Sequence, residues 1–249
     1  MNDIKSYGVD PTLIANCMAR AITFDEELIF RLETAGMYEE IEMVRQQALS
    51  CYKVLASVYN YREMECYREG HVNPRVFNIS DFLNDLLSRT KLKMRRSDIQ
   101  FDYEVENGLV CECDSDRLAA CLMNLIVNAY SNVDQEMGHV RVTVKKLFDY
   151  AAVSVVDDGY GMTNEEFSRQ MNSDGTRGLN LLREFCKTVG IEPIIDAKAP
   201  GGVSLTIRIP LASQEGLLKL ESSFKPIKNH TLSPCEVLLF KLDDVFLQM

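Results

Sequence analysis

The chain has 249 residues, enough for one large domain or two small ones with a substantial apolar core. Its formal net charge is −10, so nucleic acid is not expected as a main partner, because an acidic chain gains nothing from counterion release on DNA. No signal peptide and no long apolar span are visible, so we expect no direct membrane span. Several cysteines lie among apolar residues at helical spacing, which favours buried free thiols and a reducing, cytoplasmic location.

The N-terminal region predicts an antiparallel helical hairpin. Apolar residues recur at helical spacing over residues 11–34 and 37–66, and Gly36 between them is suited to end the first helix. In the second helix the apolar positions, including Leu55 and Val58, alternate in steps of three and four, as in a coiled coil. A lone hairpin cannot bury both its seam and its outer apolar residues. We therefore expect a homodimer with a four-helix bundle, or else packing onto the rest of the same chain.

The following region, up to residue 211, predicts blocks of helix and strand. Ser80 or Asp81 is a possible cap at the start of the first of these helices. The expected segments are a linker at 68–78, a helix at 79–96, a strand at 99–105, a helix at 114–132, strands at 139–147 and 151–157, a helix at 177–189, and strands at 191–196 and 203–210. This order predicts an α+β fold, a two-layer sandwich with helices on one face of a sheet. The C-terminal residues 212–249 are too apolar for a disordered tail, and their role cannot be assigned.

Two carboxamides stand out in the stretch CDSDRLAACLMNLIVNAYSNV at 113–133. Asn124 and Asn128 are four residues apart, so on a helix they project from the same face, one turn from each other. Polar side chains on a core-facing helix need partners. The structural interpretation is hydrogen bonding to a neighbouring loop, and the functional one is oxygen ligation of magnesium beside phosphates.

Two glycine-containing segments follow strands or loops further along the chain. In VVDDGYGM, Asp157 ends an alternating strand, and Gly159 and Gly161 permit positive φ or close approach to a ligand. A hairpin turn is the plain alternative, whereas a carboxylate there could accept a hydrogen bond from an amino group such as that of adenine. In DGTRGLNLLREFCKTVG, a glycine-rich loop enters a helix near Arg177. Exposed N–H groups at a helix start bind phosphate, although a flexible loop with a routine cap would look the same.

Together and in this order, these stretches resemble the ATP-binding domain of sensor histidine kinases and of the related gyrase, heat-shock-90 and mismatch-repair ATPases. The motif D-x-D-R-L followed by N-L-I-V-N-A resembles the asparagine box, and D-D-G-Y-G-M resembles the first glycine box. The second glycine box is matched loosely by G-T-R-G-L-N-L, and the closing strand by P-G-G-V-S-L-T-I-R-I-P. The likeness covers about 77–211. It implies a dimerisation-like hairpin at 1–70, an ATP-binding domain at 71–211 and an extension at 212–249.

The resemblance also implies roles for matching residues. Asn128 would hold magnesium against the triphosphate, with Asn124 close by, and Asp157 would read adenine. Gly159 and Gly161 would let the base approach. The phosphates would meet the start of the following helix together with Gly175, Arg177 and Gly178, and the short lid would lie between Met162 and Gly175. The implied cofactors are ATP and Mg.

The chain departs from the family in its phosphate acceptor. Histidine kinases carry a histidine on the first hairpin helix with a proline shortly after it. If Pro11 matches that proline, Ser6 takes the place of the histidine. We expect the three histidines of the chain, at positions 71, 139 and 230, to be plain structural or surface residues.

Three further departures lie in the nucleotide motifs. Asn124 stands where water-hydrolysing relatives place a glutamate general base, and a carboxamide cannot take a proton. Ser131 stands where many histidine kinases place a phosphate-binding lysine, and Asn180 replaces a glycine of the second box. We therefore expect an Mg-ATP-binding signalling protein that acts as a regulator or pseudokinase and docks a response regulator or a partner kinase. An active kinase that transfers the γ-phosphate to a partner protein, and a nucleotide-free dimeric scaffold, are the alternatives.

Overall fold

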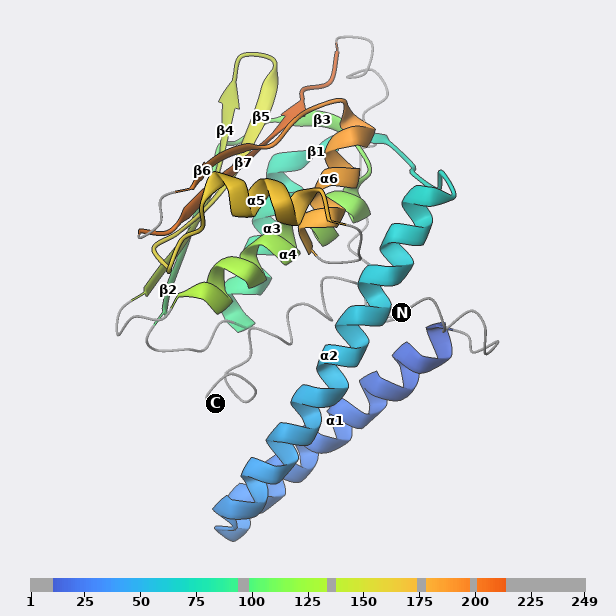
Figure 1. The fold of residues 1–249 in the computed structure, drawn as a ribbon, viewed down its shortest axis with the longest axis vertical. Helices are drawn as coiled ribbons and strands as arrows, with labels where there is room; N and C mark the ends of the chain where they lie inside the picture. Colours follow the sequence, from blue (N-terminus) through green and yellow to red (C-terminus); the bar gives the residue numbers. More distant parts are fainter. Residues whose placement is uncertain (1–10, 94–98, 134–137, 174–177, 198–200, 214–249) are drawn as a thin grey trace.

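The computed structural model describes residues 11–93, 99–133, 138–173, 178–197 and 201–213 (Figure 1). The helices are α1 (Pro11–Ala35), α2 (Tyr38–Arg68), α3 (Ile79–Lys93), α4 (Ser115–Asn132), α5 (Asn164–Met171) and α6 (Gly178–Val189). The strands are β1 (Arg75–Asn78), β2 (Ile99–Val105), β3 (Val110–Cys113), β4 (Gly138–Leu147), β5 (Tyr150–Asp157), β6 (Ile194–Ala197) and β7 (Val203–Pro210).

A mixed five-stranded sheet forms one layer of the molecule, with strand order β2-β4-β5-β7-β6. The β2–β4 pair is parallel and the other pairs are antiparallel. Helices α3, α4 and α6 contact this sheet and lie on one of its faces (Figure 1). The predicted α+β sandwich is therefore confirmed.

The core lies between the sheet and these helices, because the strands alternate buried and more exposed residues. Val142 of β4 faces Val155 of β5 across the ladder, and Ile207 on β7 continues the same buried face. Leu122 and Ile126 of α4 are fully buried against it. Successive strand residues point to opposite faces, so this alternation puts one face of each strand into the core.

Helices α1 and α2 lie alongside each other and are joined at Gly36 (Figure 1). Gly36 has a φ of 72°, and its N–H donates to the carbonyl of Glu33, while the N–H of Met37 donates to that of Leu32. This left-handed ending is typical of a glycine that closes a helix. At its other end α2 contacts α6, so the helical pair extends from the layer of helices.

Three short elements were not predicted. Strands β1 and β3 have four residues each and pair with one another, with Phe77 opposite Cys111, so β1 occupies the end of the predicted linker. Strands this short carry too little periodicity to be recognised without their partner. Helix α5 lies inside the predicted lid and buries only Phe167 and Met171. Its N-terminal capping box, made by Thr163 and Glu166, was the available signal.

Several smaller expectations differ from the structure. The first turn of α3 is capped by Asn78, whose side chain accepts the N–H of Asp81, rather than by Ser80 or Asp81. Ser80 instead donates its hydroxyl to the carbonyl of Glu106. Of the cysteines expected to be buried free thiols, Cys121 and Cys186 are buried, whereas Cys66 is partly exposed and Cys17 is exposed. None of the helices within the described ranges combines the length and the apolar character that a membrane crossing requires.

Candidate functional site

The site is built on α4, whose start is fixed by a side-chain cap. The carboxylate of Asp114 accepts the backbone N–H groups of Asp116 and Arg117 at 3.0 and 3.1 Å. Two otherwise unpaired donors of the first turn are thereby satisfied. Beyond this turn every residue from Leu118 to Val127 is buried, so α4 runs through the core. Its later polar residues Asn128, Ser131 and Asn132 are exposed, near the end of the helix.

One face of α4 carries three asparagines, Asn124, Asn128 and Asn132, spaced four residues apart. At 1.5 Å per residue they extend over about 12 Å of the helix. The amide nitrogen of Asn124 donates to the carbonyl of Ala120 at 2.8 Å, and that of Asn132 donates to the carbonyl of Asn128 at 2.8 Å. A Cβ atom on Gly178 would lie 3.1 Å from the carboxamide oxygen of Asn124, so this oxygen meets the start of α6. In each of these hydrogen bonds the partner is the asparagine's own helix, not a neighbouring loop.

Asp157 ends β5 and is only 9% exposed. Its carboxylate accepts the N–H of Gly159 at 3.0 Å. Burial raises the pKa of Asp157, while hydrogen bonds from the backbone N–H groups of Gly159 and Val203 act in the opposite direction. A half-satisfied carboxylate at the edge of a cavity is suited to accept a hydrogen bond from a ligand.

Glycines let the backbone pack closely around Asp157. A Cβ atom on Gly159 would lie 2.3 Å from the carbonyl oxygen of Asn132, so only glycine allows this loop to approach the end of α4. Gly202 has a φ of 91°, and a Cβ atom there would lie 1.9 Å from the carbonyl oxygen of Asp157. Gly161, with a φ of 73°, lies in the cavity wall, whereas Gly159 lies behind it.

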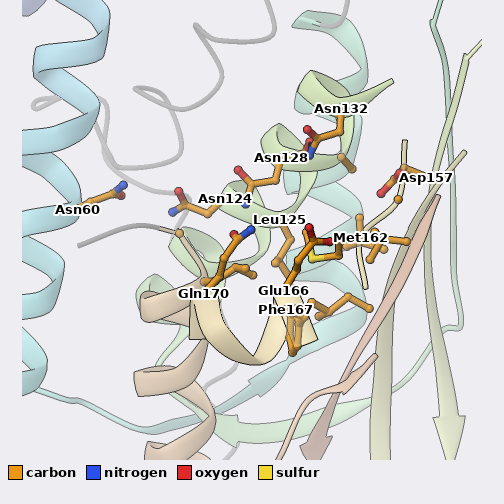
Figure 2. A pocket seen from close by; sticks show the side chains of 17 residues that line it. Asn60, Asn124, Leu125, Asn128, Asn132, Asp157, Met162, Glu166, Phe167 and Gln170 are labelled. Atoms are coloured by element: carbon orange, nitrogen blue, oxygen red, sulfur yellow. Dashed lines mark hydrogen bonds between the residues drawn. The ribbon is translucent and has the colours of Figure 1, made fainter. Parts of the chain in front are cut away.

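These elements enclose a cavity of about 550 Å³ (Figure 2). Asp157 lies at one end, the asparagines of α4 follow one side, and Asn60 of α2 lies at the opposite end. The apolar lining consists of Leu125, Ala129, Val155, Met162, Phe167, Leu179, Val203 and Leu205. Such a cavity, with polar groups along one side and an apolar wall, is of the size of a small-molecule site.

Helix α5 forms another wall of the cavity and is held at both ends. At its start the carboxylate of Glu166 accepts the N–H of Thr163 at 2.8 Å, and the hydrogen bonds from Thr163 lower the pKa of Glu166. At its end the buried Asn180 of α6 donates to the carbonyl of Ser173 at 2.8 Å, and Arg183 donates to that of Met171 at 2.7 Å. Asn180, which stands where the family has a glycine, therefore links the end of α5 to α6 by a hydrogen bond.

The cavity brings together five of the eight predicted site residues: Asn124, Asn128, Asp157, Gly161 and Gly178. Gly159 lies next to the cavity, and Gly175 and Arg177 lie outside the described residues. The cavity also includes Asn60, Asn132, Glu166 and Gln170, which were not predicted. The four-residue spacing from Asn128 could have pointed to Asn132, but no local pattern points to Asn60.

The charge of the cavity is negative where the structure describes it. Asp157 and Glu166 are its carboxylates, and none of the described lining residues is basic. Ser131, at the place of the family lysine, is exposed and outside the lining. A polyphosphate would therefore need a bound cation, or a basic group such as Arg177 that lies outside the described residues.

The residues that form most of the cavity match a known protein family. Residues 113–213 match the family described as histidine kinase-, DNA gyrase B-, and HSP90-like ATPase. The chain contains a histidine kinase-like ATPase domain. The matched segment includes α4, Asp157 and the cavity walls from β5, α5, α6 and β7, whereas α2 precedes it.

Two sensor histidine kinases are similar in sequence. TmoS of Ectopseudomonas mendocina is 23% identical over 222 residues, which cover 81% of this chain and 22% of that protein. ZraS of Klebsiella oxytoca is 28% identical over 163 residues, which cover 61% of this chain and 35% of that protein. The chain thus spans only about a fifth to a third of the length of these relatives.

Two solved structures share the fold. Histidine kinase AdeS of Acinetobacter baumannii has a TM-score of 0.54 and 17% identity, covering 78% of this chain and 96% of that one. Full-length ShkA, in complex with AMPPNP, has a TM-score of 0.53 and 18% identity, covering 82% of this chain and 47% of that one. At such identities these structures show the fold alone.

Proposed function

We propose that the histidine kinase-like domain binds Mg-ATP in the cavity and that the chain acts as a regulator or pseudokinase in two-component-type signalling. The observation that carries the proposal is the pairing, in one cavity, of the buried Asp157 carboxylate with the asparagine face of α4. Asp157 would accept a hydrogen bond from the adenine amine, and the apolar wall that includes Met162 and Phe167 would cover the base.

The residues present fit magnesium and a triphosphate. Magnesium prefers oxygen ligands and commonly bridges protein and phosphate, and Asn128, with Asn124 beside it, offers carboxamide oxygens along the cavity. Gly178 at the start of α6 leaves backbone room that a Cβ atom would fill against Asn124. The first N–H groups of α6 are suited to phosphate, and Gly175 and Arg177 would add to this site. Bound magnesium would neutralise part of the phosphate charge that the cavity itself does not balance.

The carboxylates of the cavity favour a regulator over a hydrolase. A general base must be free to take a proton from water. Asp157 is buried at the end that we assign to adenine, and Glu166 is held in the capping box with a lowered pKa. Asn124 stands where water-hydrolysing relatives place a glutamate base, and its amide nitrogen donates to the carbonyl of Ala120 in its own helix. The described part of the cavity therefore offers binding groups but no suitable base.

The acceptor would also have to come from a partner if phosphate were transferred. His71 is exposed and lies beside Glu69, and His139 on β4 lies beside Asp102, so neither lines the cavity. His230 and Ser6 lie outside the described residues. An active kinase that acts on a partner protein, and a scaffold that has lost nucleotide, remain the alternatives that the experiment below separates.

We assign partner binding to the helical region within residues 1–70, as a homodimer that docks a response regulator or a kinase. Exposed apolar side chains on α1 and α2 support this, since Phe30 is 70% and Met43 is 75% exposed. A cytoplasmic location is consistent with the free thiols of the described cysteines. Sedimentation of the chain is expected to give a dimer, and a monomer at all concentrations would contradict this assignment.

Calorimetric titration of ATP, with and without magnesium, tests the proposal. We expect saturable binding that requires magnesium and that Asp157→Ala abolishes, while the exposed Asp149→Ala serves as a matched control. Transfer of labelled γ-phosphate to a response regulator would establish the active kinase instead of the regulator. If millimolar ATP does not bind, the scaffold alternative is correct.

A further inference from the structure

The carboxamide of Asn60 enters the cavity from α2, outside the segment that matches the ATPase family. Its side chain points toward Asn124 across the cavity (Figure 2). The carboxamide oxygen of Asn60 is buried and has no hydrogen-bond partner in the described part of the chain. A buried acceptor without a partner costs free energy, so its presence here requires an explanation.

The position of Asn60 is fixed by the packing of α2 on the ATPase domain. One turn further along α2, Glu63 forms an ion pair with Arg117 of α4, and these side chains are only 6% and 13% exposed. The guanidinium of Arg117 also lies over the ring of Tyr67, 5.8 Å from its centroid, and Met64 is buried. Asn60, Glu63, Met64 and Tyr67 follow helical spacing and share one face of α2. The face that contacts the ATPase domain is therefore the face that carries Asn60.

Asn60 lies at the end of the cavity opposite Asp157 (Figure 2). The inference rests on the proposed function: with adenine at Asp157, the nucleotide runs along the asparagines of α4, and its phosphates point toward Asn124 and Asn60. Asn132 and Asn124 are separated by about 12 Å along the helix axis, so only an extended ligand reaches from one end to the other. A carboxamide offers an oxygen to a magnesium ion or its water, and an N–H₂ group to a phosphate oxygen.

We propose that Asn60 is a ligand of the magnesium–triphosphate end of the nucleotide, so that helix α2 forms part of the nucleotide site. The magnesium or its water satisfies the buried carboxamide oxygen of Asn60, while the amide N–H₂ group can donate to the terminal phosphate. Binding of a triphosphate then strengthens the contact between α2 and the ATPase domain, whereas a diphosphate does not reach it. The helical region thereby responds to a bound triphosphate through the direct contact of Asn60 with it.

The test compares Mg-ATP and Mg-ADP binding to the full chain in the wild type, Asn60→Ala and Asn60→Asp. The matched control is Gln47→Ala, which removes an exposed carboxamide from the same helix. We expect Asn60→Ala to weaken Mg-ATP binding about tenfold and Mg-ADP binding less than about twofold, because only the longer ligand brings a charged phosphate and its magnesium to Asn60. Asn60→Asp is nearly isosteric and should keep Mg-ATP binding, because a carboxylate is a good magnesium ligand. Gln47→Ala should bind as the wild type does.

Amide hydrogen exchange gives a second readout that does not depend on affinity. Saturating Mg-ATP should slow exchange over residues 58–68 of α2 in the wild type, and Asn60→Ala should remove this protection at saturating nucleotide. Equal weakening of Mg-ATP and Mg-ADP, or no change in either, would overturn the role of Asn60 and leave the proposed function standing. If the wild type binds neither nucleotide, the proposed function and this inference both fail.

Discussion

The ATPase domain and the helical pair α1–α2 differ in the apolar packing of their described residues. In the ATPase domain Leu122, Ile126, Val142 and Ile207 are fully buried between helices and sheet. In the described part of the helical pair only a few apolar residues are buried, and Phe30 is largely exposed. The domain can therefore be stabilised by its own core, and the exposed side chains of the helices can contact another molecule. The proposed nucleotide site is built mainly on the part with this core, and the helices that we assign to partner binding carry exposed side chains such as Phe30 and Met43.

The largest expected effect comes from the core of the ATPase domain. Leu122→Ala should lower the free energy of unfolding by about 2–5 kcal/mol, because it removes a fully buried side chain and leaves a cavity. Urea denaturation followed by circular dichroism measures this loss. Met43→Ala, at a residue that is 75% exposed, is the control and should change stability little at concentrations where the chain is monomeric. Similar losses in both variants would remove the contrast between the two regions.

The next effect concerns the junction between the regions. Glu63→Ala leaves the mostly buried guanidinium of Arg117 without its carboxylate and should cost about 2–3 kcal/mol. Denaturation again measures the cost, and proteolysis should cut more readily near the end of α2. Glu65→Ala, which breaks the more exposed pair with Arg68, is the matched control and should cost well under about 1 kcal/mol. If Glu63→Ala behaves like the control, the junction does not fix α2.

A smaller and local effect is expected at helix α5, within the predicted lid. Asn180→Gly restores the family glycine and removes the donor that holds the carbonyl of Ser173, and should cost about 1–2 kcal/mol. Amide exchange over residues 164–171 should become faster than in the rest of the ATPase domain. Uniform faster exchange throughout the domain would show that Asn180 supports the core in general and does not specifically hold α5.

The smallest effect is a gain in stability at Asp157. Burial raises the pKa of this carboxylate, so the folded state binds the proton more tightly than the unfolded state. Stability is therefore lost as pH rises from below the ordinary carboxyl value through the raised pKa. Asp157→Asn removes the penalty, and its melting temperature without nucleotide should exceed that of the wild type at pH 7. The difference in melting temperature between the two proteins should shrink near pH 3. A difference independent of pH would show that the raised pKa of Asp157 is not its cause.

The parts that could be predicted from the sequence are those with local patterns. The asparagine pair on α4 and the Asp157 turn depend on spacing within one element or one loop, and the structure places these residues in one cavity. Strands β1 and β3 were missed because each is recognisable only through the other. Asn60 was missed because its role follows from the packing of α2 against α4 and α6, which no spacing within α2 reveals. Asn180 was noticed as a departure, but its hydrogen bonds to the end of α5 required the structure.

The central claim is that the carboxylate of Asp157 accepts a hydrogen bond from the adenine amine at one end of the cavity. The most direct test compares the affinities of ATP and inosine triphosphate, which carries a ring carbonyl in place of the amine, for the wild type and Asp157→Asn. We expect the wild type to prefer ATP by about tenfold or more, because a carboxylate accepts from the amine and is repelled by the carbonyl. Asparagine can also donate, so Asp157→Asn should lose or reverse this preference. Equal affinities of the wild type for both nucleotides, or a preference unchanged in Asp157→Asn, would contradict the account.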